Sequence, residues 1–62
     1  MRAWLIEARI KKGFTQKELS ELVKISQPHM CDIEQEKKTP RPDTAKRIAK
    51  VLGFNWTRFY DK

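Results

Sequence analysis

Apolar residues recur at spacings of three and four along most of the 62-residue chain. This period is typical of helices that bury one face, and no segment shows the alternation of apolar and polar residues expected of a strand. Gly13, Ser26, the "TPRP" of residues 39–42 and Gly53 interrupt the pattern and divide the chain into five short segments. We therefore expect an all-α protein with five helices.

The first segment covers about residues 2–12. Leu5, Ala8 and Lys12 fall on one face of this segment, and Ile6 and Ile10 form a second stripe. Gly13 follows it, and glycine is the residue best suited to the left-handed conformation that often ends a helix. We expect the first helix to end there.

The second segment begins with a capping box. Thr15 and Glu18 have the Thr-x-x-Glu spacing in which each side chain binds a backbone N–H of the other residue. A helix is expected over about residues 15–23. Three of its apolar residues are expected to be buried: Leu19, Leu22 and Val23.

The third segment has the start signal of a helix over about residues 27–35. Ser26 is a good capping residue, and Pro28 fits only in the first turn, where no internal hydrogen bond needs its missing N–H. Met30 and Ile33 are three residues apart and are expected to face inward.

The fourth helix has the clearest pattern. It is expected to begin at Pro42 and to end at Gly53. Its buried face follows the i, i+3, i+4, i+7 spacing: Ala45, Ile48, Ala49 and Leu52. Asn55 can cap a last short helix over about residues 56–61.

The net charge of +6 is high for this length and favours a nucleic acid or another anionic surface as the partner. The charge is unevenly distributed. Residues 1–24 carry six basic and three acidic side chains, residues 25–36 carry none and three, and residues 37–62 carry eight and two. Basic flanks therefore enclose an acidic centre.

Cys31 is the single cysteine, so no disulfide can form within the chain and a reducing, cytoplasmic setting is expected. No apolar run approaches the roughly 20 residues of a membrane span. The apolar stretch at the start of the chain is too short and too charged to be a secretory signal. We expect a soluble protein in which residues 1–62 form one domain.

The sequence offers little for catalysis or for metal binding. It has no nucleophile paired with a base, no paired carboxylates in a cleft and no phosphate-binding loop. His29 and Cys31 are two residues apart and would point to different faces of a helix, with no further His or Cys to complete a metal site. We therefore expect that the protein is not an enzyme and that it binds no cofactor, metal or small-molecule ligand.

Several short motifs carry a resemblance to a known family. Two short helices joined by Lys24–Ser26 suggest a helix-turn-helix by spacing alone. The most specific motifs are Gly13–Gln16, Glu18–Leu19, Ser26, Ile33–Glu34, Pro40 and Leu52–Phe54. With them the chain resembles the helix-turn-helix DNA-binding domains of phage repressors and Cro proteins, over about residues 5–59. The resemblance implies a five-helix domain whose third helix lies in the major groove of double-stranded DNA.

The resemblance also implies roles for single residues. The positions that fall where the family contacts base edges are Gln27, Pro28, His29 and Asp32. Those that fall where it contacts phosphates are Gln16, Lys17, Lys37, Lys38 and Arg41. Arg9 and Glu34 match an ion pair that ties the first helix to the third. Trp56 and Tyr60 lie at the end of the domain through which family members form dimers.

Three residues depart from the family pattern. Lys24 and Glu36 stand at turn positions that usually hold glycine, where a left-handed conformation is unfavourable unless the loop is rebuilt. Pro28 replaces a residue that often donates hydrogen bonds, so it is expected only to pack against a sugar or a thymine methyl group.

Two functions are consistent with these observations. The first is a sequence-specific regulator of transcription, a repressor that binds a pseudo-palindromic operator as a homodimer with half-sites about 34 Å apart. The second is a protein-interaction module, of antirepressor or antitoxin type, that uses the acidic third helix to bind a basic partner. The acid-only stretch from residue 25 to residue 36 is the best support for the second function.

Overall fold

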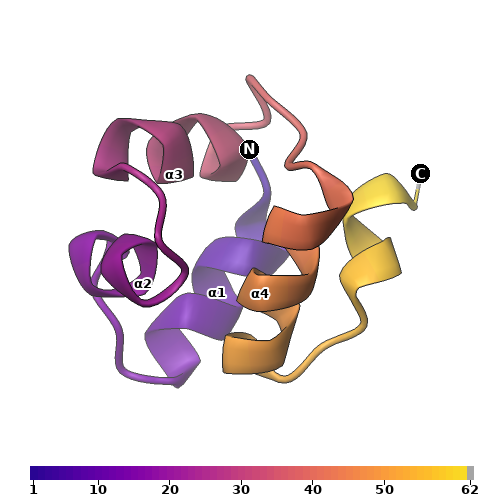
Figure 1. Cartoon of the computed structure of the whole chain (residues 1–62). Coiled ribbons are helices and arrows are strands. Elements are labelled where there is room, and N and C mark those ends of the chain that lie inside the picture. The colour runs from indigo at the N-terminus through magenta and orange to yellow at the C-terminus, as the bar shows by residue number, and fades with distance from the viewer. Residues whose placement is uncertain (62) are drawn as a thin grey trace.

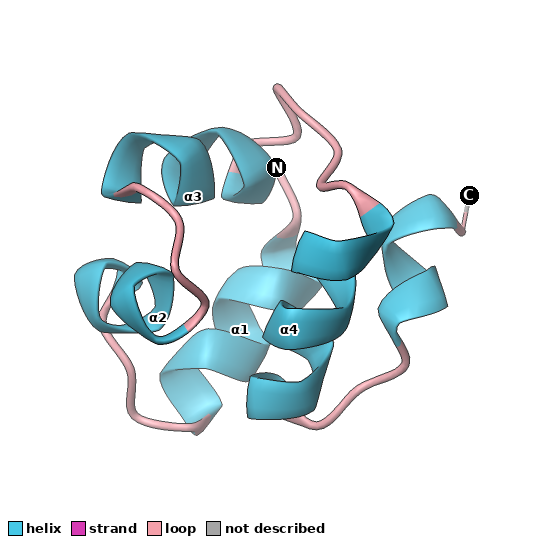
Figure 2. Ribbon diagram, viewed as in Figure 1, coloured by secondary structure: helices cyan, strands magenta, loops and turns pink. Residues whose placement is uncertain are grey.

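Five helices make up most of residues 1–61, the part of the chain that the computed structural model describes. They are α1 (Ala3–Lys11), α2 (Gln16–Leu22), α3 (Gln27–Glu34), α4 (Pro42–Leu52) and the 3₁₀ helix η1 (Trp56–Tyr60). Loops connect them, and residues 1–61 contain no strand (Figure 2). The expected all-α class is confirmed, with four α-helices and a fifth helix of the tighter 3₁₀ type.

The helices surround one small core. In Figure 1, α2 and α3 lie on one side of the molecule and η1 on the other, with α1 and α4 between them. Every helix contributes to the buried set: Leu5, Leu19, Val23, Met30, Ile33, Ala45, Ile48, Ala49, Leu52 and Phe59. Trp4, Phe54 and Phe59 pack against one another with ring centroids 5.1–5.5 Å apart, which closes the core beneath η1.

The capping residues define where the helices begin. The Thr15 side chain accepts the Glu18 N–H, and the Glu18 carboxylate accepts the Thr15 N–H, so the expected capping box is present. Ser26 accepts the N–H of His29 at 3.2 Å, and Asn55 accepts the N–H of Thr57 at 3.1 Å. These side chains satisfy N–H groups that a helix start leaves without partners.

The first helix ends in a Schellman motif. Gly13 has a positive φ of 81° and donates its N–H to Ile10, while Phe14 donates to Arg9. These two bonds satisfy carbonyl groups that the last turn of α1 leaves open. The expected end of the first helix at Gly13 is confirmed.

Helices α2 and α3 end in the same way without glycine. Lys24 and Glu36 adopt positive φ values of 62° and 63°. The residue after each one completes the motif: Ile25 donates to Ser20, and Lys37 donates to Asp32 at 2.9 Å. The loops are therefore not rebuilt, and both residues adopt a conformation that is unfavourable for a side chain with a Cβ.

One burial prediction was wrong. Leu22 was expected in the core but is 52% exposed, because Leu19 and Val23 occupy the inward face of α2. Leu22 precedes Val23 and points about 100° away from it around the helix axis. Ile10, which shares an apolar stripe with Ile6, is 62% exposed. Among residues 1–61, no helix is long and apolar enough to cross a membrane.

Candidate nucleic-acid interface

Helix α3 lies at one edge of the molecule, where α1 and α2 support its inner side (Figure 1). Met30 and Ile33 point inward and are fully buried, as their spacing predicts. On the other side, Gln27 and Pro28 are exposed, and His29 and Asp32 are half-buried. The helix therefore presents short polar side chains and a proline outward, with no basic residue among them.

The last residue of α3 is fixed by buried polar contacts. The Glu34 carboxylate accepts hydrogen bonds from Arg9 Nε at 2.8 Å and Arg9 Nη2 at 3.3 Å. The side chain of Glu34 is 2% exposed and that of Arg9 is 13% exposed. Arg9 Nη1 also donates to the Phe14 carbonyl at 3.0 Å. A two-pronged pair of this kind restricts orientation as well as distance, so it fixes α3 relative to α1.

Gln16 takes part in the same network. Its Nε2 donates to Glu34 Oε1 at 3.0 Å, which joins the first residue of α2 to the last residue of α3. The amide nitrogen has two N–H groups, so this bond leaves one for another acceptor. Lys17, the next residue, is exposed.

The segment 35–41, which follows α3, carries three of the basic residues expected to contact phosphates. Lys37, Lys38 and Arg41 are all exposed. Lys38 Nζ lies 3.9 Å from Asp32 Oδ2, and the N–H groups of Lys37 and Lys38 both point to the Asp32 carbonyl. The end of α3 and the start of this segment therefore form one structural unit, and Asp32 has a cation beside it.

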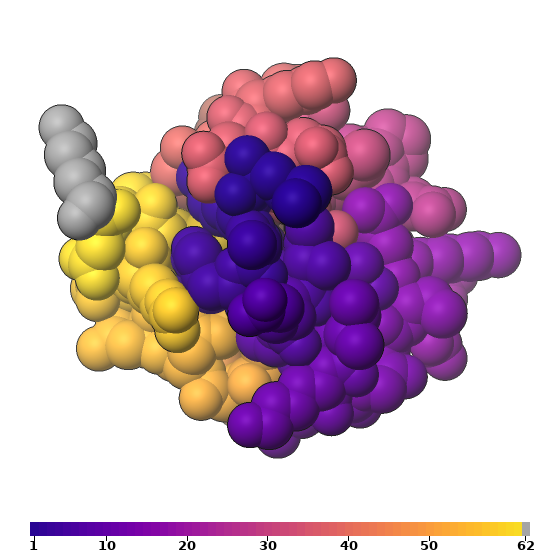
Figure 3. All heavy atoms as spheres, turned by 180° about the vertical axis from the view of Figure 1, so that it is seen from behind, coloured from indigo at the N-terminus to yellow at the C-terminus, as the bar shows by residue number. Residues whose placement is uncertain are grey.

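The sequence analysis did not single out Arg2, which is 8% exposed. Its guanidinium donates to the carbonyls of Ile33 and Lys38 and to Thr39 Oγ1, and it lies 5.6 Å from the centre of the Phe59 ring. Seen from behind, the first residues lie against the segment that follows α3 (Figure 3). The main hydrogen-bond acceptors of Arg2 are backbone carbonyls, which every residue has, so no sequence pattern identified this arginine.

Trp56 and Tyr60 lie on η1, away from α3 (Figure 1). Their rings pack edge to face with centroids 5.8 Å apart, and Lys46 Nζ lies 4.9 Å from the centre of the Trp56 ring. Tyr60 is 42% exposed, while Trp56 is half-buried. The Tyr60 hydroxyl donates to the Pro40 carbonyl at 2.8 Å.

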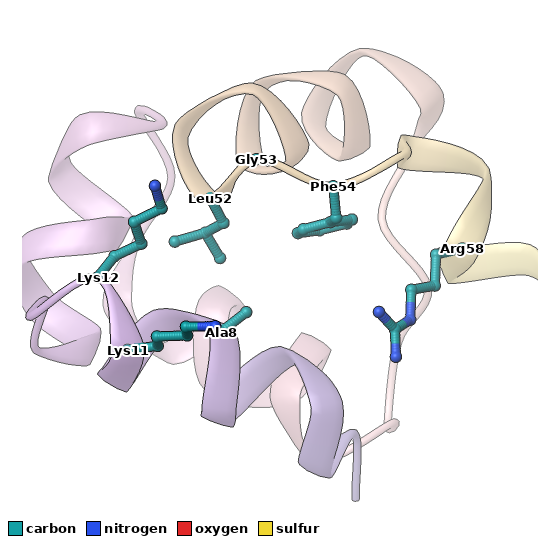
Figure 4. A pocket seen from close by; sticks show the side chains of 7 residues that line it. All are labelled: Ala8, Lys11, Lys12, Leu52, Gly53, Phe54 and Arg58. Carbon is teal, nitrogen blue, oxygen red and sulfur yellow. The ribbon is translucent and has the colours of Figure 1, made fainter.

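A second basic area surrounds a hollow of about 430 Å³. Figure 4 shows Leu52 and Phe54 above Ala8, with Lys11, Lys12 and Arg58 around the rim. The residues that line this hollow come mainly from the ends of α1 and α4. Figure 1 shows these two helix ends away from α3. The described part of the chain contains no group of three or more His, Cys, Asp or Glu side chains placed to hold a metal. Cys31 is a free, half-buried thiol.

Comparisons with known proteins agree with this geometry. A helix-turn-helix family model matches residues 5–59, which is most of the chain. A relative from Bacillus subtilis (strain 168), named uncharacterized HTH-type transcriptional regulator YqaF, is 38% identical over 61 residues. That match covers 98% of this chain and 80% of the relative. No solved structure gave a significant match. The chain belongs to the helix-turn-helix family, which confirms the resemblance seen in its motifs.

Proposed function

We propose that this protein binds double-stranded DNA through α3 and regulates transcription. The main support is the way in which α3 is held. Its inner side is fixed by buried residues and by the Arg9–Glu34 ion pair, and on its outer side Gln27 and Pro28 are exposed to solvent. A helix fixed in this way is suited to enter the major groove. The family and the name of the Bacillus subtilis relative support a regulator rather than an enzyme.

The proposed separation of phosphate contacts from base contacts explains why α3 lacks basic residues. Phosphate contacts supply most of the sequence-independent affinity, and base contacts supply the specificity. We assign base contacts to Gln27, Pro28, His29 and Asp32. Gln27 has the two-sided amide that matches adenine N6 and N7, and Asp32 can accept from cytosine N4. Lys38, 3.9 Å from Asp32, reduces the repulsion between that carboxylate and nearby phosphates.

We assign the phosphate contacts to residues that flank α3: Gln16, Lys17, Lys37, Lys38 and Arg41. The four basic residues among them are exposed. The Gln16 side chain is held by Glu34, so its remaining amide N–H is available in one fixed place. The segment 35–41 carries most of this charge, and we infer that it follows the DNA backbone.

We further propose that two copies bind one operator. Trp56 and Tyr60 would form the contact between them, because they are aromatic, partly exposed and away from α3. A two-fold dimer would place two α3 helices on half-sites about 34 Å apart along the duplex. In this proposal residues 1–62 are one DNA-binding domain, and the protein acts inside the cell as a repressor by occupying its operator.

The alternative of an acidic protein-binding helix loses its main support. Of the three acids in residues 25–36, Glu34 is buried against Arg9 and Asp32 lies beside Lys38. Glu36 is exposed, and its Oε1 lies 3.8 Å from the N-terminal ammonium group of Met1. One exposed carboxylate does not make an acidic surface.

Amide chemical shifts on addition of duplex DNA test the proposal. We expect the largest changes at residues 27–32 and 37–41, with small changes around the hollow between α1 and α4. Changes that centre on that hollow, or no saturable change at all, would contradict binding through α3.

A further inference from the structure

Residues 37–41 are held by two side chains from distant parts of the chain. Arg2 binds the Lys38 carbonyl at 3.0 Å and Thr39 Oγ1 at 3.3 Å. Tyr60 binds the next carbonyl, that of Pro40, at 2.8 Å. Three successive residues of this segment are thus tied to the body of the protein, although connecting segments on a protein surface are usually more mobile than the elements they join.

The environment of Arg2 fits this role. Its guanidinium has no carboxylate within 4.0 Å in residues 1–61, so its charge is met by carbonyl oxygens and by the Phe59 ring. Its backbone N–H donates to the Glu34 carbonyl at 2.7 Å. The end of a helix carries partial negative charge on such carbonyls, which favours a cation there. Arg2 therefore joins the end of α3 to the segment that follows it.

Tyr60 adds a second restraint from η1. Its ring packs on Trp56, and its hydroxyl reaches back to Pro40, which is buried. The neighbouring residue Phe59 lies under the Arg2 guanidinium. The two restraints thus meet at η1, about 20 residues along the chain from the segment that they hold.

We propose that Arg2 and Tyr60 act as a clamp that sets the conformation of residues 37–41. Both are positioning residues: they act through backbone groups and hold Lys37, Lys38 and Arg41 in place. The consequence for DNA rests on the proposed function, because a phosphate contact made by a pre-positioned lysine avoids the ordering of a mobile loop.

Hydrogen exchange of the free protein tests the clamp directly. The Lys37 and Lys38 amides, which point to the Asp32 carbonyl at 2.9 and 3.3 Å, report the opening of the segment. Tyr60→Phe removes one hydroxyl and leaves the ring, so we expect exchange about two- to tenfold faster at these amides, the range for one hydrogen bond. Arg2→Gln should have a larger effect, and Arg2→Lys an intermediate one, because lysine keeps the charge but loses the planar fork.

Arg58→Gln is the matched control. Arg58 also lies over an aromatic ring, that of Trp4 at 4.5 Å, but it makes no hydrogen bond to residues 37–41. The Arg58→Gln substitution removes the same positive charge as Arg2→Gln, so the long-range attraction between protein and DNA changes equally in the two variants. We expect unchanged exchange at Lys37 and Lys38 for Arg58→Gln. We expect weaker DNA binding by Arg2→Gln than by this control, and weaker DNA binding by Tyr60→Phe than by the wild type, whose charge it keeps.

The results separate the clamp from the proposed function. Unchanged exchange at Lys37 and Lys38 in Tyr60→Phe and in folded Arg2→Lys would overturn the clamp, whatever the DNA binding. Faster exchange in both variants, with a wild-type protein that binds no duplex, would support the clamp and contradict the proposed function. Faster exchange in Arg2→Gln with a DNA affinity equal to that of Arg58→Gln would overturn the consequence that we draw for DNA.

Discussion

The Glu34 carboxylate and the Arg9 guanidinium form a two-pronged ion pair, with Nε–Oε2 and Nη2–Oε1 distances of 2.8 and 3.3 Å. Glu34 also accepts from Gln16, so one carboxylate joins α1, α2 and α3. This ion pair both stabilises the core of the protein and fixes the orientation of α3, the helix that we propose reads DNA. Its loss should therefore reduce stability and DNA binding together.

Glu34→Gln should strongly destabilise the fold. It leaves a largely buried arginine without its counter-charge, and breaking such a pair typically costs about 3 kcal/mol. That is a large part of the stability of a chain of this size. Urea denaturation measures the change. Glu7→Gln removes an equal charge from an exposed position on α1 and should stay within about 0.5 kcal/mol of wild type. Equal effects of the two variants would contradict a structural role for the pair.

Glu36→Gly should stabilise the protein. The φ of 63° at Glu36 is unfavourable for a residue with a Cβ, and relief of this conformation is worth about 1 kcal/mol. In a domain of this length the melting temperature should rise by about 4–8 °C.

Glu36→Gln separates backbone from charge at this position. It removes the carboxylate but keeps the Cβ, so its melting temperature should stay near that of wild type, while both variants should bind DNA more tightly because an exposed acid is lost. A rise in melting temperature for Gln equal to that for Gly would show that charge, and not backbone conformation, limits stability here.

The capping box of α2 should contribute to acid sensitivity. The Thr15 backbone N–H, and then its side chain, hydrogen-bond the Glu18 carboxylate and lower its pKa. Because the folded pKa lies below the unfolded one, this stabilisation is complete above about pH 4.3, the ordinary glutamate value, and is lost as the pH falls through the folded pKa. Thermal unfolding between pH 6 and pH 3 should show a smaller decrease in melting temperature for Glu18→Gln than for wild type. An identical decrease would show that the cap does not depend on ionisation.

Base and phosphate contacts should respond differently to mutation. Gln27→Ala should change the preferred base at one position of each half-site by about 1–3 kcal/mol of discrimination. Lys37→Ala should weaken binding to all sequences and reduce the salt slope by about one unit. Lys37 is the better choice than Lys38, because removing Lys38 also frees Asp32. Fluorescence anisotropy with matched and mismatched duplexes measures both effects, and a uniform loss for Gln27→Ala would remove it from base readout.

Trp56→Ala should weaken assembly more than folding if η1 forms the dimer contact. Sedimentation of the protein with an operator-length duplex should show two wild-type copies per duplex and mainly one copy of the variant at the same concentration. Circular dichroism checks that the variant remains helical. Two copies of Trp56→Ala bound with unchanged affinity would place the dimer contact elsewhere.

The sequence predicted those parts of the structure that depend on local chemistry. The buried face of α4 follows from its spacing, and the capping box follows from Thr15 and Glu18. The Arg9–Glu34 pair was expected only through the resemblance, since 25 residues separate its members. Helical spacing alone misplaced Leu22, because the edge of an apolar stripe depends on which neighbouring helix covers it.

Other features could not be predicted, for physical reasons. Arg2 and Tyr60 bind backbone carbonyls, and any residue can supply a carbonyl. The left-handed conformations of Lys24 and Glu36 were indicated only through the resemblance, because glycine, their usual signal, is absent at both positions. The proximity of Asp32 and Lys38 depends on the turn that follows α3 and not on a helical spacing.

Selection of binding sites from a randomised duplex pool at near-physiological salt tests the central claim most directly. The account predicts enrichment of a two-fold symmetric sequence with half-sites about one helical turn apart. It also predicts that a parallel selection with Gln27→Ala yields the same spacing with a changed base at one position of each half-site. Retention without enrichment of any sequence by the folded wild-type protein would contradict base reading by α3.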